Sequence, residues 1–168
     1  SNGLVYDDAG AIASLDGISG VVVDQSSSET VKSDSATLDD VSILGTTPDF
    51  PNVRDMTLAR GRYFTEADNE RKAKVAILGA SLAQGLFGSS DPVGQVVRVG
   101  NTKLTVIGVF EEKGGGSTDF DSVLYTPISV VFQKFTPSFF ARVMGDQVRM
   151  IYAKVEDQSR MEDIILQI

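Results

Sequence analysis

The most informative part of the sequence begins with MTLARGRYFTEAD at residues 56–68 and continues to Phe110. Its last part predicts a β-hairpin. Gln95–Val99 and Lys103–Phe110 are rich in apolar and β-branched residues, and they flank Gly100-Asn101, a pair that suits a tight turn with positive φ. The stretch therefore favours a β-rich unit in the middle of the chain.

Two short helices and a buried strand are predicted in the same stretch. Thr65 followed by Asp68 approximates a capping box, which marks the start of a helix. Val75–Leu78 is a continuous apolar run, typical of a strand that is covered on both faces. Ser81 is expected to cap a second helix, and Gly88 to end it.

The flanking parts predict further strands and helices. Strands are expected where β-branched residues alternate or cluster, at 18–23, 37–44, 121–126 and 148–155. The composition of Ser26-Ser27-Ser28 indicates a loop. Helices are expected from Asp7 or Asp8 to about Leu15, over 128–135, and at the end of the chain, where Met161, Ile164, Ile165 and Ile168 follow helical spacing.

Composition excludes several functions. The chain has 168 residues, and its 15 basic and 23 acidic residues give a net charge of −8, so binding to nucleic acid is not expected. It contains no cysteine and no histidine, which removes disulfides, thiolate nucleophiles and the commonest metal ligands. No apolar run reaches the ~18 residues needed to span a bilayer.

Candidate chemical motifs are weak. Gly114–Thr118 lacks the Gly-Lys-Ser/Thr ending of a phosphate-binding loop, and a mobile loop is expected there instead. Asp119 and Asp121, with Glu111 and Glu112, could approach one cation, but no EF-hand spacing is present. Asp39 and Asp40 are adjacent and so point to opposite faces of a strand, and Ser81 is explained as a cap rather than a nucleophile. We expect no catalytic, metal or cofactor site.

Several motifs in order resemble a known family. They are GTTPDF (45–50), LARGRYFTEAD (58–68), KVAILG (74–79), LFG (86–88), DPVG (91–94) and VIGV (106–109). Their order and spacing are similar to those of the extracytoplasmic core domain of MacB-type ABC transporter permeases, a group that also includes FtsX-like permeases. The resemblance covers about half of the chain, with weaker similarity towards both ends.

The resemblance implies an α+β fold with two lobes. An α/β Porter-like lobe would be formed by both chain ends, residues 4–47 and 127–168, and a β-rich Sabre-like lobe, residues 48–126, would be inserted between them. Four residues are the hinge candidates between the lobes: Gly45, Pro48, Pro51 and Pro127. Family members usually have a strand ahead of the segment that resembles Leu4–Asp8, so the Porter-like sheet is expected to expose an edge here.

The resemblance also implies a function without catalysis. The domain would lie outside the cell membrane and pass on motion driven by an ABC ATPase domain or subunit, in a parent protein expected to be dimeric. The partner could be a periplasmic adaptor, a lipoprotein, a peptide or a cell-wall hydrolase. Four aromatic residues form a candidate partner surface: Phe132, Phe135, Phe139 and Phe140. The alternatives are a carboxylate-based extracytoplasmic hydrolase and a structural module that dimerises through an edge strand.

Overall fold

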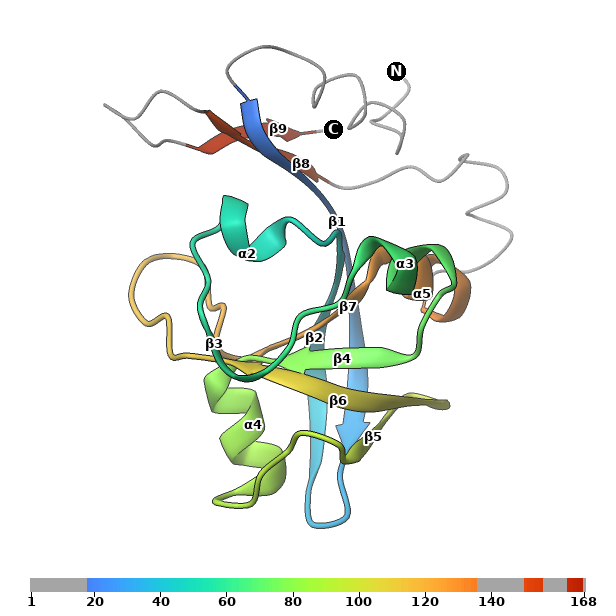
Figure 1. Ribbon diagram of the computed structural model, residues 1–168. Helices are drawn as coiled ribbons and strands as arrows, with labels where there is room; N and C mark the ends of the chain where they lie inside the picture. The colour runs from blue at the N-terminus through green and yellow to red at the C-terminus, as the bar shows by residue number, and fades with distance from the viewer. Residues whose placement is uncertain (1–17, 136–149, 156–162, 168) are drawn as a thin grey trace.

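Strands dominate the computed structural model, which describes residues 18–135, 150–155 and 163–167 (Figure 1). The strands are β1 (Ile18–Lys32), β2 (Thr37–Thr46), β3 (Leu58–Gly61), β4 (Val75–Leu78), β5 (Val96–Val99), β6 (Thr102–Phe110), β7 (Val123–Pro127), β8 (Met150–Val155) and β9 (Asp163–Gln167). The helices are α2 (Phe50–Val53), α3 (Glu66–Glu70), α4 (Ala80–Phe87) and α5 (Ile128–Lys134). In this described part, no helix is both long and apolar enough to cross a membrane. The helix expected near Leu15 lies outside it.

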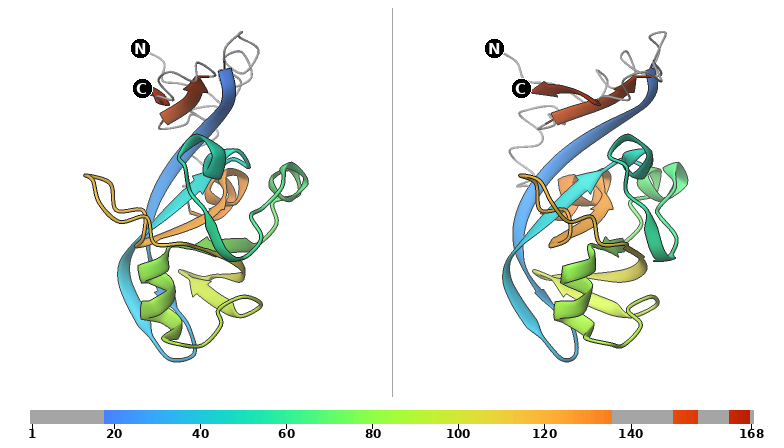
Figure 2. Two further views of the ribbon diagram at one scale, coloured as in Figure 1. Left: turned by 60° about the vertical axis from the view of Figure 1, so that its left-hand side comes forward. Right: turned by 90° about the vertical axis from the view of Figure 1, so that its left-hand side faces the viewer.

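Strand β1 runs along the length of the molecule, as both views in Figure 2 show. It has 15 residues, and its pairing partner changes part of the way along. Ile18–Asp24 pairs with β8, whereas Gln25–Lys32 pairs with β2. The far end of β1 also pairs with β5, where Val31 lies opposite Val99.

The loop predicted at Ser26-Ser27-Ser28 is wrong. These residues continue β1 and lie opposite Leu44, Ile43 and Ser42 of β2. A ladder is held by backbone hydrogen bonds, so small polar side chains do not interrupt it when a partner strand is available. Their composition could not reveal that partner.

The part of the molecule that lies lower in Figure 1 is a closed ring of strands. β1 pairs with β2, β2 with β7, β7 with β4, β4 with β6, β6 with β5, and β5 returns to β1. Strand β3 adds to the end of β6. Beyond the ring, β8 and β9 extend the sheet from the other half of β1.

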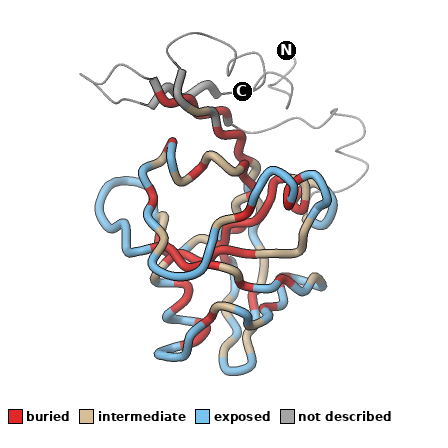
Figure 3. Tube along the Cα trace, viewed as in Figure 1, coloured by how far each residue is buried: buried red, intermediate tan, exposed pale blue. Residues whose placement is uncertain are grey.

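The main hydrophobic cluster fills this ring. Val97, Val99, Leu104 and Val106 are fully buried, and the residues between them are exposed or half-buried. Leu82 and Leu86 of α4 belong to the same cluster. Figure 3 shows this buried interior surrounded by exposed loops.

The structure confirms several elements that local sequence signals predicted. The hairpin is formed by β5 and β6, and Gly100 at its turn has φ +56°. The capping box at α3 is complete, because Thr65 Oγ1 accepts from Asp68 N while Asp68 Oδ2 accepts from Thr65 N. The helix expected over 128–135 is α5.

The cap predicted for α4 is wrong. The helix begins at Ala80, Gly79 is its N-cap, and no side chain caps it. Instead, the carbonyl oxygen of Asp121 accepts a hydrogen bond from Leu82 N at 3.0 Å. A side chain at residue 79 would overlap that carbonyl, so glycine is required for this close approach.

The helix predicted at the end of the chain is also wrong over residues 163–167, and the rest of it lies outside the described residues. Residues 163–167 form β9, antiparallel to β8, with Ile165 opposite Tyr152. The isoleucines are β-branched and therefore suit a strand better than a helix. The edge of β8 supplies the backbone partners that the spacing pattern could not anticipate.

Candidate functional site

The junction between the two halves of β1 is the most unusual region of the described chain. Here β1 leaves β8 and joins β2, at Asp24 and Gln25. The hinge candidates Gly45 and Pro127 lie at the same level, because β2 and β7 pair in parallel with Thr46 opposite Pro127. Gly45 is buried under α5, where any side chain would meet Val131 at about 2.5 Å.

Helix α2 covers this junction. Pro51 lies in its first turn, where the missing N–H has no cost, and Pro48 precedes it. The ring of Phe50 packs among aromatic neighbours, with centroid distances of 5.0 Å to Tyr125 and 6.4 Å to Phe110. The junction is therefore tightly packed.

A charged tether joins β8 to the segment that follows α2. Lys154 Nζ donates to the carbonyl oxygen of Asn52 and to Asp55 Oδ1, both at 2.9 Å. Beside it, the guanidinium of Arg54 stacks 4.1 Å above the ring of Tyr152. These contacts connect residues about 100 positions apart in the chain.

Asp24 is the buried acid at this junction. Only 5% of the residue is exposed, and burial raises the pKa of its carboxyl group to about 7, although Thr46 and Arg54 oppose the rise. Within the described residues, neither Asp24 Oδ1 nor Thr46 Oγ1 has a partner that meets hydrogen-bond geometry. A buried polar atom without a partner is costly.

Tyr63 adds a third such atom. Its hydroxyl is buried and has no hydrogen-bond partner in the described part of the chain. Burial raises the pKa of Tyr63 well above its usual value, and the negative charge of Asp24 raises it further. Tyr125 differs, because its hydroxyl donates to the carbonyl oxygen of Phe120 at 2.8 Å.

Sequence reasoning missed Asp24, Thr46, Arg54 and Lys154. The only signal in the sequence is that Asp24 ends the apolar run Val21-Val22-Val23, which is common at a solvated strand end. The groups near that carboxylate, Thr46, Arg54 and Tyr63, are distant in sequence.

The predicted aromatic surface is described only in part. Phe132 and Phe135 are half-buried at α5, and Phe135 packs against the main hydrophobic cluster. Phe139 and Phe140 lie outside the described residues.

Asp119 and Asp121, beside the glycine loop, stabilise the loop by accepting hydrogen bonds from nearby backbone N–H groups. Asp121 accepts hydrogen bonds from Lys113 N at 2.8 Å and Gly114 N at 2.9 Å, and Asp119 accepts from Asp121 N and Ser122 N. Among the described residues, no group of three or more potential metal ligands is gathered at one point.

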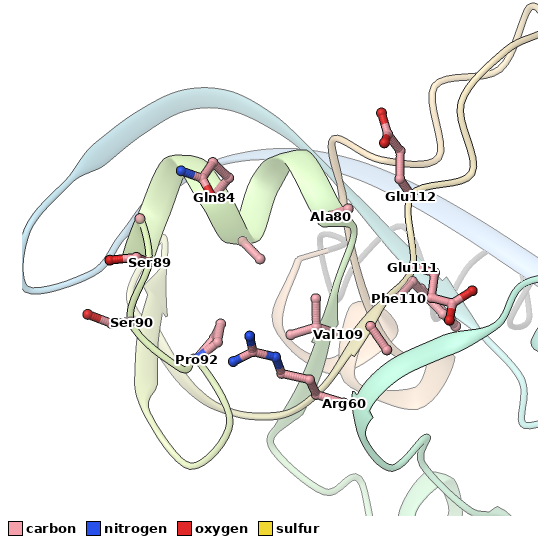
Figure 4. Close-up of a pocket in the computed structure, with 13 residues that line it drawn as sticks. Arg60, Ala80, Gln84, Ser89, Ser90, Pro92, Val109, Phe110, Glu111 and Glu112 are labelled. Atoms are coloured by element: carbon pink, nitrogen blue, oxygen red, sulfur yellow. The ribbon is translucent and has the colours of Figure 1, made fainter.

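A surface hollow of about 420 Å³ lies between α4, the turn after it and β3 (Figure 4). Arg60 reaches over it and forms an ion pair with Asp91 at 3.4 Å. Glu111 and Glu112 line its other side, and Figure 4 shows their carboxylates pointing in different directions. They do not face one another as a pair of catalytic carboxylates would.

Comparisons with known proteins agree with one another. A family model described as the MacB-like periplasmic core domain matches residues 1–168. The macrolide export ATP-binding/permease protein MacB of Syntrophobacter fumaroxidans is 36% identical over 118 residues, and that of Azoarcus sp. is 35% identical over 162. These matches cover 69% and 95% of the chain, which spans only 16% and 23% of those relatives' lengths.

The fold has a close counterpart among solved structures. The periplasmic region of MacB from Actinobacillus actinomycetemcomitans matches with a TM-score of 0.79 at 22% sequence identity. The match covers 99% of this chain and 80% of that structure. The mixed α/β fold with dominant strands is therefore that of a MacB periplasmic region.

Proposed function

Because the chain belongs to the MacB-like periplasmic core domain family, we propose that it passes ATP-driven motion to a partner without catalysing a reaction itself. It would be the extracytoplasmic domain of an ABC transporter permease subunit. The relatives are named as ATP-binding/permease proteins for macrolide export, which supports an ATPase domain or subunit as the source of motion. A periplasmic adaptor, a lipoprotein, a peptide or a cell-wall hydrolase would receive it.

The observation that carries this proposal is the sharing of β1 between two ladders. One half of β1 pairs with β8, which belongs to the C-terminal part of the chain, and the other half pairs with β2 and β5 in the ring. A continuous strand cannot move at one end without displacing what is paired to its other end. Such a strand can carry a rigid-body displacement through the molecule.

The division into lobes is part of the proposal. Residues 4–47 and 127–168 would form the Porter-like lobe, and residues 48–126 the inserted Sabre-like lobe. Its support is that the chain's two crossings lie side by side, since Thr46 is opposite Pro127 in the β2–β7 ladder. Residues 25–46 pair with the inserted segment in the ring, so they would move with it. An inserted lobe that moves as one body needs both crossings at one place, and hinges are formed by a few such residues.

The tether between Lys154 and Asp55 gives a direct test in the intact permease. Lys154→Met and Asp55→Asn each remove the ion pair, and Lys134→Met is the control because Lys134 is an exposed residue of α5. We expect export to fall several-fold in the tether variants while ATP hydrolysis continues. Unchanged export in both variants, and in a deletion of residues 53–124, would contradict the proposal.

The absence of catalysis is tested separately. The purified chain should release no product from peptidoglycan, glycoside or ester substrates above the level of a heat-denatured sample. Turnover that disappears in Asp24→Asn or Glu111→Gln would instead favour the hydrolase alternative.

A further inference from the structure

Three basic residues lie directly opposite one another across three neighbouring strands of the ring. Lys32 of β1 is the register partner of Arg98 of β5, and Arg98 is the partner of Lys103 of β6. All three are exposed on the outer face, while the residues beside them in the strands, such as Val99 and Leu104, are buried. We call Lys32, Arg98 and Lys103 the cationic row.

The cationic row is uncompensated in the described structure. Elsewhere in the described structure, basic residues do form ion pairs, namely Arg60, Arg62, Arg71 and Lys154. No member of the row has a carboxylate within ion-pair distance among the described residues. Like charges that face each other across strands destabilise a sheet, and this chain carries a net charge of −8, so basic residues are the minority.

A shallow hollow of about 470 Å³ follows the row. Its lining includes all three basic residues together with Ser33, Asp34 and Val96. Val96 is 50% exposed and is the one large hydrophobic side chain that is exposed in the described part of the chain. The surface thus combines positive charge with an apolar contact, and Asp34 is the single acid in its lining.

We propose that the cationic row, with Val96, is a docking surface for an acidic helical segment of a partner protein. Neighbouring strands are roughly 4.8 Å apart, so the row spans about 10 Å. Carboxylates three or four residues apart on one face of a helix are separated by about 5–6 Å, which matches this spacing. An apolar residue on the same face would cover Val96, which a phosphate or a free carboxylate ion would leave exposed.

The position of the row suits this role. Figure 1 shows β5 and the turn between β1 and β2 at the end of the molecule opposite β8 and β9. The row includes Lys32 of β1, the strand that would transmit motion in the proposed function. A partner docked on the row would therefore contact that strand. Peptide binding by the row does not depend on the proposed function, and only its consequence for transport rests on it.

Peptide binding by the purified chain tests the row directly. The probe is a fluorescent alanine-based helical peptide with Glu at every fourth position and one Leu on the same face, and the control peptide has Gln in place of each Glu. We expect binding of the Glu peptide that weakens with salt, and about tenfold weaker binding by Arg98→Gln/Lys103→Gln, which loses two exposed charge pairs.

A matched variant of equal charge completes the experiment. Lys72→Gln/Lys134→Gln removes two exposed basic residues elsewhere and should bind like the parent chain. Relief of like-charge repulsion should also raise the unfolding midpoint of the row variant at low salt. Equal binding of both peptides, equal loss in both variants, or binding only to anionic vesicles or pyrophosphate would overturn the inference.

The outcome separates this inference from the proposed function. Failure of the Glu peptide to bind removes the acidic partner segment and leaves transmission through β1 untouched. Export that survives loss of the Lys154 tether removes transmission and leaves peptide binding by the row untouched.

Discussion

Two aspartates, Asp68 in α3 and Asp24 in β1, have almost equally little exposed surface, but Asp68 lies just beneath two exposed arginines and Asp24 lies deep in the protein. Asp68 is 3% exposed, and its carboxylate accepts from Arg71 Nη2 at 2.6 Å, from Thr65 N at 2.9 Å and from Arg62 Nη1 at 2.9 Å. The hydrogen bond from Arg71, followed by that from Thr65, holds the pKa of Asp68 well below its usual range. Burial alone does not decide the charge of a carboxyl group.

Asp24 has the same side chain and 5% exposure, but its Oδ1 has no hydrogen-bond partner among the described residues. Desolvation therefore dominates, and the pKa of Asp24 rises to about 7. The cation that opposes the rise is Arg54, whose guanidinium also stacks on Tyr152.

The two sites differ in whether their buried polar atoms have hydrogen-bond partners among the described residues. The start of α3 is a closed local network, since its donors are within six residues of Asp68. As far as the structure describes the chain, the junction in β1 holds buried polar atoms without a hydrogen-bond partner, from β1, β2 and the segment before α3. Perturbed buried groups occur at functional sites more often than elsewhere, and this one lies where we propose that motion crosses the molecule.

The largest expected effect is that of Asp24→Asn, which keeps the shape of the side chain and removes its charge. The folded pKa of Asp24 is about 7, against an ordinary value of 3.8, so the parent's stability from this group is present below pH 4 and lost as pH rises to 7. The loss is about 1.4 kcal/mol per pH unit, or about 4 kcal/mol in total. Asp24→Asn does not show this loss of stability, because asparagine does not titrate.

Urea unfolding of the parent chain and Asp24→Asn at several pH values gives the measurement. The free energy of unfolding of the variant minus that of the parent should grow between pH 4 and pH 7 and stay level above pH 8. A difference that is constant over this range would show that Asp24 titrates in the folded chain as it does in the unfolded chain.

Asp68→Ala should have the next largest effect, in the opposite direction. It removes the hydrogen bond that Asp68 accepts from Thr65 N at the start of α3. Arg62 and Arg71 lose their carboxylate partner, but water can solvate them because their side chains are 53% and 67% exposed. We expect a loss of about 2–3 kcal/mol at pH 7. The pKa of Asp68 is lowered in the folded chain, so its contribution is present above pH 4 and declines as pH falls below that value.

The matched control for this change is Glu70→Ala in the same helix. Glu70 is exposed, so its removal should alter the free energy of unfolding by no more than about 0.5 kcal/mol. Equal losses in Asp68→Ala and Glu70→Ala would mean that the network at the start of α3 adds nothing beyond an ordinary surface charge.

The two aspartates also explain how far the sequence could be interpreted. The network of Asp68 was partly predictable, because a capping box links residues three apart. The hairpin turn at Gly100 was predictable for the same reason, since its requirement for positive φ is local.

What the sequence could not predict depends on partners distant in the chain. Asp24 resembles an ordinary polar strand end until Tyr63 and Thr46 are placed beside it. Met161, Ile164, Ile165 and Ile168 have helical spacing, yet β8 makes residues 163–167 a strand. The cap of α4 is the carbonyl of Asp121, a backbone group that no side-chain pattern records.

The smallest expected effect compares two tyrosine hydroxyls in one aromatic cluster. Tyr125→Phe removes a hydroxyl that donates to the carbonyl oxygen of Phe120, and it should cost about 1 kcal/mol. Tyr63→Phe removes a buried hydroxyl with no partner in the described part of the chain, so the free energy of unfolding should be unchanged or slightly higher. Thermal or urea unfolding at pH 5, where Asp24 is largely protonated, measures both. If Tyr63→Phe costs as much as Tyr125→Phe, the Tyr63 hydroxyl has a buried water as its partner, and the junction is better satisfied than the contrast with Asp68 requires.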